Sequence, residues 1–133
     1  MITVDTNLIA YFFIRSEHTA LAEAVWQKES RWNAPRLWRS EFRNVLNLYI
    51  RRNALDLDGA VEKMSEAENI IGEREFDVDS RRVLELAKWS GCTSYDCEFV
   101  YVAERLDVPL VTSDKKLLAA FPDRAVSMAD FTA

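Results

Sequence analysis

The stretch MITVDTNLIAYFF, residues 1–13, decides the fold class, because three polar residues separate two apolar runs. The first run, Ile2–Val4, predicts a short strand, and the second, from about Leu8, predicts a helix. Asp5 begins the polar interruption and therefore lies at the carboxyl end of the strand. An aspartate there is a good helix N-cap. It also occupies the edge of a sheet where functional groups collect.

The same alternation of strand and helix continues along the chain. Strands are predicted at Ile2–Val4, Trp32–Ala34, Phe76–Val78, Val108–Val111 and Ala125–Ser127. Helices are predicted from about Leu8 and at Thr19–Glu29, Leu37–Arg52, Leu57–Ile71, Ser80–Ser90, Tyr95–Leu106 (capped by Ser94) and Lys115–Phe121. Strands separated by helices need crossover connections, which favour a parallel sheet covered on both faces. We therefore predict one α/β domain over residues 1–133, with a short central parallel sheet flanked by helices.

Composition limits the function further. The longest apolar run, Leu8–Ile14, is far shorter than the ~20 residues that cross a bilayer, and the N-terminus shows no signal-peptide pattern. We expect a cytoplasmic protein without membrane contact. Two cysteines and a single histidine argue against a disulfide framework and against zinc. Any metal should be bound by oxygen, as Mg²⁺ or Mn²⁺ is.

Glu41 is the acid that is hardest to explain structurally. On a helical wheel of the Leu37–Arg52 helix it lies inside the apolar arc, between Val45 and Leu48. An unpaired carboxylate is costly to bury. The alternatives are a buried ion pair, for example with Arg15, and a metal ion.

Two further acids have good structural explanations of their own. Asp96 lies in the first turn of a helix, where a negative charge is favourable, and Asp114 follows a strand as a possible N-cap. A parallel sheet can bring Asp5, Glu41, Asp96 and Asp114 to one end. Four carboxylates cannot all stay ionised at close range without cations. The acids therefore hold either shared protons or, in keeping with their hard oxygen ligands, Mg²⁺.

Three stretches carry a resemblance that covers nearly the whole chain: VDTNLI (4–9), APRLWRSEFRNVL (34–46) and SYDCEFVYVAERLDVPLVTSDKKL (94–117). They resemble a PIN domain of the VapC toxin type. The resemblance implies a Mg²⁺- or Mn²⁺-dependent endoribonuclease that is the toxin of a type II toxin–antitoxin pair, with RNA as substrate, a cognate antitoxin protein as partner, and a homodimeric state.

Carried over by residue, the resemblance makes Asp5, Glu41, Asp96 and Asp114 the catalytic and metal-binding acids, with Thr6, Asn7 and Thr112 in support. The chain departs from the family at two neighbouring positions. Cys97 replaces a frequent alanine, and Glu98 occupies a position that is often apolar. We expect no catalytic role for Cys97 and a solvent-facing side chain for Glu98.

The net charge of −5 argues against nucleic acid at first, because phosphates are bound by Lys and Arg. The four site acids contribute −4 of that charge, however, and a metal would offset much of it. Arg39, Arg43 and Lys115 are predicted to contact backbone phosphates. Their alternative is ordinary solvated surface.

The resulting hypothesis is in-line attack on an RNA phosphodiester by a metal-activated water, with one ion or two. Three alternatives stay open. A receiver-type signalling domain also places acids and Mg²⁺ at strand ends, although only one acid follows the first strand here. A haloacid-dehalogenase-like phosphatase would need a second aspartate at position 7, where the chain has Asn7. A PIN-fold protein that binds RNA or a protein partner without cutting is the third. The RNA target and the identity of the antitoxin are left open.

Overall fold

The computed structural model describes residues 1–133 as five strands and eight helices that alternate along most of the chain. The strands are β1 (Ile2–Val4), β2 (Trp32–Pro35), β3 (Glu75–Phe76), β4 (Leu110–Val111) and β5 (Ala125–Val126). The helices are α1 (Thr6–Phe13), α2 (Thr19–Lys28), α3 (Leu37–Arg51), α4 (Leu57–Ile71), α5 (Ser80–Ser90), α6 (Ser94–Leu106), α7 (Lys115–Ala120) and α8 (Met128–Thr132).

The five strands form one parallel sheet in the order β3-β2-β1-β4-β5. Strand β1 is central, with Thr3 in register with Asn33 of β2 on one side and Leu110 of β4 on the other. The predicted fold class, a single α/β domain with a parallel sheet, is confirmed. The order differs from the 2-1-3-4-5 order of receiver-like domains, so the receiver alternative is wrong.

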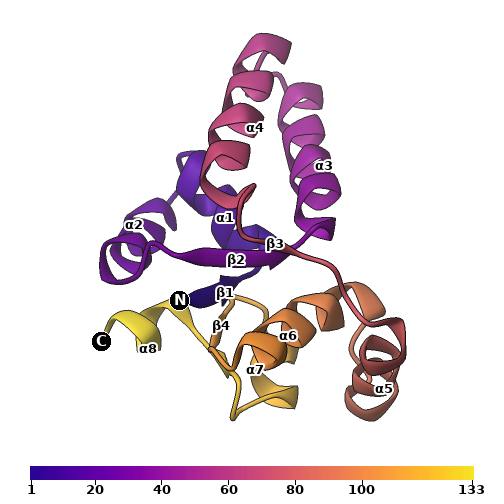
Figure 1. The fold of residues 1–133 in the computed structure, drawn as a ribbon. Coiled ribbons are helices and arrows are strands. Elements are labelled where there is room, and N and C mark those ends of the chain that lie inside the picture. Colours follow the sequence, from indigo (N-terminus) through magenta and orange to yellow (C-terminus); the bar gives the residue numbers. More distant parts are fainter.

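Helices cover both faces of this sheet (Figure 1). On one face α3 and α4 run side by side and both pack against α1. On the other face α6 packs against β1, β2 and β4 and is backed by α5. The C-terminal helix α8 packs against α2.

One contiguous hydrophobic core holds the layers together. Its largest fully buried side chains include Trp32 of β2 and Trp38 and Phe42 of α3. The Trp38 and Phe42 rings lie 6.2 Å apart, and Phe42 is also 6.2 Å from Phe13 of α1. Burial of each large aromatic ring removes about 150–250 Å² from water. This packing fixes the orientation of α3 relative to α1, and with it the position of Glu41.

The sequence-based elements need several corrections. Helix α1 begins at Thr6 rather than at about Leu8, and β4 is Leu110–Val111 rather than Val108–Val111. The cap of α6 is Thr93, whose hydroxyl accepts a hydrogen bond from the Asp96 N–H at 3.0 Å, and not Ser94. The third strand is Glu75–Phe76 rather than Phe76–Val78, because it pairs only where it meets Ala34 and Pro35. The short helix α8 was not predicted. No helix is long and apolar enough to span a membrane.

Candidate active site

The carboxyl ends of β1 and β4 mark the point where the strand order reverses, which is where α/β sheets place their ligand sites. Asp5 follows β1 directly, and Asp114 follows β4 after Thr112 and Ser113. Glu41 from α3 and Asp96 from the first turn of α6 reach the same place. The four acids line one cavity of about 80 Å³ together with Thr6 and Asn7. Side chains from positions 5 to 114 therefore line one cavity.

Asp5 is buried and held from several sides. Its Oδ1 accepts the N–H of Leu8 at 2.9 Å, so the residue is indeed the N-cap of α1. Its Oδ2 accepts hydrogen bonds from the Thr112 hydroxyl and from the Ser113 N–H. Burial raises the pKa of Asp5 above its ordinary value, although these hydrogen bonds oppose the effect. The carboxylate has about four acceptor positions, of which three are used.

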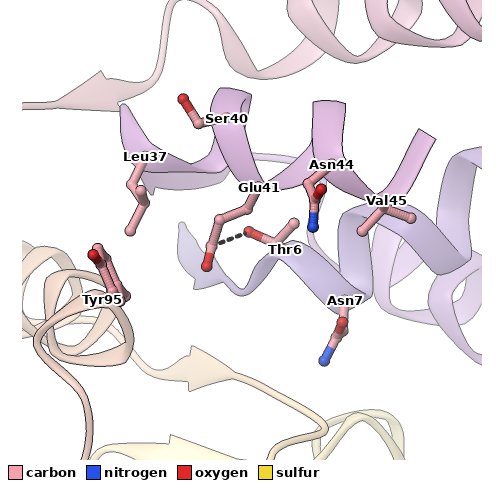
Figure 2. Close-up of a pocket in the computed structure, with 8 residues that line it drawn as sticks. All are labelled: Thr6, Asn7, Leu37, Ser40, Glu41, Asn44, Val45 and Tyr95. Atoms are coloured by element: carbon pink, nitrogen blue, oxygen red, sulfur yellow. Dashed lines mark hydrogen bonds between the residues drawn. The ribbon is translucent and has the colours of Figure 1, made fainter. Parts of the chain in front are cut away.

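Glu41 is half-buried and accepts a hydrogen bond from the Thr6 hydroxyl at 2.8 Å (Figure 2). It forms no ion pair, and Arg15 instead approaches Glu23 at 3.9 Å on the surface. The ion-pair alternative from the sequence is therefore wrong. Burial raises the pKa of Glu41, and the charges of Asp96, Asp5 and Glu98 raise it further. The neighbours of Glu41 are thus other acids, which favour the protonated form of its carboxyl group.

Asp96 and Asp114 keep the structural roles that the sequence suggested. Asp114 is the N-cap of α7, and its Oδ1 accepts the N–H groups of Lys116 and Leu117. Burial raises the pKa of Asp96 and the charge of Asp114 adds to the effect, whereas a hydrogen bond with the Thr93 hydroxyl and the charge of Lys116 oppose it. Asp96 and one oxygen of Asp114 therefore remain available to a ligand.

The four acids fit a divalent cation in chemistry more closely than in present geometry. They offer only oxygen donors, and three of them have pKa values raised by burial and by one another. Such a set suits a hard ion such as Mg²⁺ or Mn²⁺. No three acidic, histidine or cysteine side chains of the structure are arranged to hold one ion as they stand, however. The four acids therefore line one cavity, and the arrangement of their oxygens around one cation stays a prediction.

The cations predicted to contact phosphate do not line this cavity. The Arg39 guanidinium is engaged by Glu75 and Glu68, which join α3 to β3 and α4. Arg43 lines a separate groove between α3 and α4. Lys115 is exposed and makes no ion pair. For Arg39 the physical reason is plain: two carboxylates already satisfy its guanidinium.

Three residues near the site were missed or misjudged. Glu98 is not simply solvent-facing, because burial raises its pKa and its charge acts on Glu41. Lys116, rather than Lys115, is the lysine whose charge acts on Asp96. Tyr95 lies on a neighbouring cavity and is 61% exposed. Their sequence signal was adjacency to Asp96 and Asp114, which does not reveal on which side of a helix a residue lies.

Comparison with known proteins gives a family match and a match to a solved structure. The sequence matches the family described as PIN domain over residues 2–122. Among solved structures, the fold is similar to that of PAE2754 from Pyrobaculum aerophilum, with a TM-score of 0.78 at 22% sequence identity, covering 98% of this chain and 92% of that one. No curated protein sequence matches significantly. At this sequence identity the structural match supports a shared fold and nothing further.

Proposed function

The chain belongs to the PIN domain family, and from this membership we propose that it is a metal-dependent endoribonuclease. PIN domains are typically metal-dependent nucleases that commonly use Mg²⁺ or Mn²⁺. The observation that carries the proposal is the meeting of Asp5, Glu41, Asp96 and Asp114 in one small cavity at the carboxyl edge of the sheet. An acidic cavity has little value for stability, since its members raise one another's pKa.

Some groups of the cavity orient the carboxylates, and other groups are free to react. Thr112 and the Leu8 N–H fix Asp5, so its free acceptor position keeps one direction. Thr6 fixes Oε1 of Glu41 and leaves Oε2 free. A divalent ion, when bound, supplies the positive charge that lets an anionic phosphodiester approach four carboxylates and makes water a better nucleophile. We assign Glu41, whose Oε2 accepts no hydrogen bond within the protein, to take the proton from the attacking water.

The primary test is cleavage of total cellular RNA and of synthetic single-stranded RNA with Mg²⁺, with Mn²⁺ and with EDTA. We expect fragments that depend on the metal and that disappear in Asp96→Asn and in Glu41→Gln. A matched control is Asp123→Asn, an exposed acid outside the cavity, which should cut as the wild type does. Equal cleavage by Asp96→Asn and the wild type would refute the assignment.

We further propose that the nuclease is the toxin of a type II toxin–antitoxin pair and acts as a homodimer. The support is the VapC-like motif set around the four acids. Induced expression should arrest growth, Asp96→Asn should not, and co-expression of the product of an adjacent short open reading frame should restore growth. Light scattering of the purified protein reports the oligomeric state.

A second candidate function is RNA binding without cleavage, and one observation favours it. No three of the acids are placed to share an ion in the present side-chain positions. This alternative predicts that RNA shifts in a gel equally in EDTA and in Mg²⁺, and stays intact in both.

A further inference from the structure

A second cavity opens directly beside the acidic one, and three residues line both. Thr6, Asn7 and Glu41 form the shared wall. The second cavity is completed by Leu37, Asn44 and Tyr95, with further contributions from the same side of α3 (Figure 2). Its volume is about 380 Å³, against about 80 Å³ for the acidic cavity. The acidic cavity is too small for an organic ring, whereas the second lies within the ~300–1,000 Å³ of small-molecule sites.

Resting on the proposed ribonuclease function, we propose that this second cavity binds a nucleobase of single-stranded RNA next to the phosphate that is cut. Tyr95 would stack on the base, and the Asn44 carboxamide would bind its edge. These are positioning and specificity residues rather than members of the acidic cluster.

The exposure of Tyr95 is the first observation that supports the binding of a base. The residue is 61% exposed, its ring contacts no other aromatic ring, and its hydroxyl makes no hydrogen bond. The other exposed aromatic, Trp89, differs because it lies against the ring of Phe121 at 6.0 Å. Figure 2 shows Tyr95 near Leu37 at one end of the cavity, so an aromatic and an aliphatic side chain lie together there. Stacking on aromatic side chains is the usual way in which proteins hold unpaired bases.

The charge of the cavity is the second observation. No Lys or Arg lines it, and Glu41 is its only charged group. A phosphate would be repelled there, whereas an uncharged ring would not. The phosphate belongs instead at the acidic cavity, where a cation can neutralise it. The acidic cavity would thus receive the phosphate of a nucleotide, and the second cavity would receive its base.

The third observation is the placement of hydrogen-bonding groups. Glu41 and Asn44 are three residues apart on α3 and therefore share one side of that helix. Glu41 is held by Thr6, whereas the Asn44 carboxamide makes no hydrogen bond and is exposed. A free carboxamide carries a donor and an acceptor side by side, which lets it distinguish base edges.

The direct test is a titration of the ¹⁵N-labelled protein with each of the four ribonucleosides in EDTA, followed by NMR. Nucleosides carry no phosphate, so the acids do not repel them and no cleavage is required. We expect at least one nucleoside to shift the signals of Tyr95 and of the Asn44 side-chain amide. Tyr95→Ala and Asn44→Ala should each weaken binding about fivefold or more, whereas Tyr95→Phe should bind within about twofold of the wild type.

The matched control is Asn47→Ala, an exposed asparagine on α3 that lines the groove facing α4. It should leave binding unchanged. The proposal is overturned if no nucleoside shifts the Tyr95 and Asn44 signals, or if Asn47→Ala weakens binding as strongly as Asn44→Ala.

Mapping of RNA ends separates this proposal from the ribonuclease function. If the wild type cuts RNA, Asn44→Ala should change the base preferred beside the cut, and an unchanged preference overturns the proposal. If the wild type cuts no RNA with either metal, the ribonuclease function fails. The nucleoside titration then decides alone whether the cavity binds bases.

Discussion

The hydroxyl of Thr112 donates a hydrogen bond to Oδ2 of Asp5, 107 positions earlier in the chain. The hydroxyl oxygen of Thr112 also accepts the N–H of Asp114 at 3.0 Å. One fully buried side chain therefore links the acid that follows β1 to the acid that follows β4. This contact exists only because the two strands are neighbours in the sheet.

Thr112→Val keeps the shape of the side chain and removes both hydrogen bonds. We expect the free energy of unfolding to fall by about 1–3 kcal/mol, because the change leaves a buried carboxylate oxygen and a backbone N–H without this partner. Asp5 should also lose its fixed direction, so RNA cleavage should fall. Urea unfolding and the cleavage rate measure the two effects. Thr112→Ser keeps the hydroxyl and should restore most of both, and a valine variant as stable and active as the wild type would contradict the role of this contact.

Asp96→Asn should stabilise the metal-free protein while it abolishes cleavage. The wild-type carboxylate is partly buried near Asp114, and its raised pKa shows that ionisation is unfavourable there. Removal of the charge should raise Tm in EDTA by about 1–3 °C. Mg²⁺ should raise the Tm of the wild type and have less effect on the variant. Differential scanning calorimetry with and without Mg²⁺ checks this, and Asp123→Asn should leave both values unchanged.

The stability difference between Asp96→Asn and the wild type should depend on pH. The folded protein binds the Asp96 proton more tightly than the unfolded chain, whose pKa is 3.8. Ionised Asp96 lowers the free energy of unfolding. This penalty shrinks as pH falls from the raised folded pKa toward 3.8. The advantage of the variant should be present at neutral pH and vanish near pH 3.8. Urea titrations in EDTA across this range measure it, and an advantage that grows on acidification would show that the sign is wrong.

Glu75→Gln should show the opposite pH behaviour. The Glu75 carboxylate is 3% exposed and accepts hydrogen bonds from Arg39 and from the Trp38 indole, and the bonds to Arg39 are the largest cause of its lowered pKa. We expect the variant to lose about 1–3 kcal/mol at neutral pH. The difference should hold above the unfolded pKa of 4.5 and shrink as pH falls through the lowered folded pKa. Asp77→Asn, at the exposed pair with Arg36, should change stability little.

The sequence was informative where burial decides the structure. The position of Glu41 inside the apolar arc of its helix followed from the helical period, and the structure finds the side chain half-buried. Asp5 and Asp114 followed from their places at strand ends, because parallel strands bring their carboxyl ends to one edge. These inferences needed only local pattern and one topological rule.

The sequence was less informative where a choice depended on distant partners. Arg39 is engaged by Glu75 and Glu68, and that engagement exists only once β3 pairs with β2 and α4 packs on α3. Thr93 and Ser94 are equally good caps, so the backbone alone decided between them. The helix α8 has five residues, too few for a periodic pattern.

Lys116→Ala should impair RNA cleavage more than Lys115→Ala, although the two lysines are adjacent. The charge of Lys116 acts on Asp96, and its Nζ donates a hydrogen bond to the Gly91 carbonyl at 2.8 Å, which holds it near the loop before α6. Lys115 makes no such contact. A lysine whose charge acts on Asp96 should help bind phosphate, so its removal should raise KM several-fold with a smaller change in kcat, and the effect should weaken as salt increases. Steady-state cleavage of a fluorescent RNA at two salt concentrations measures this, and equal KM values for the two variants would show that Lys116 has no special place at the site.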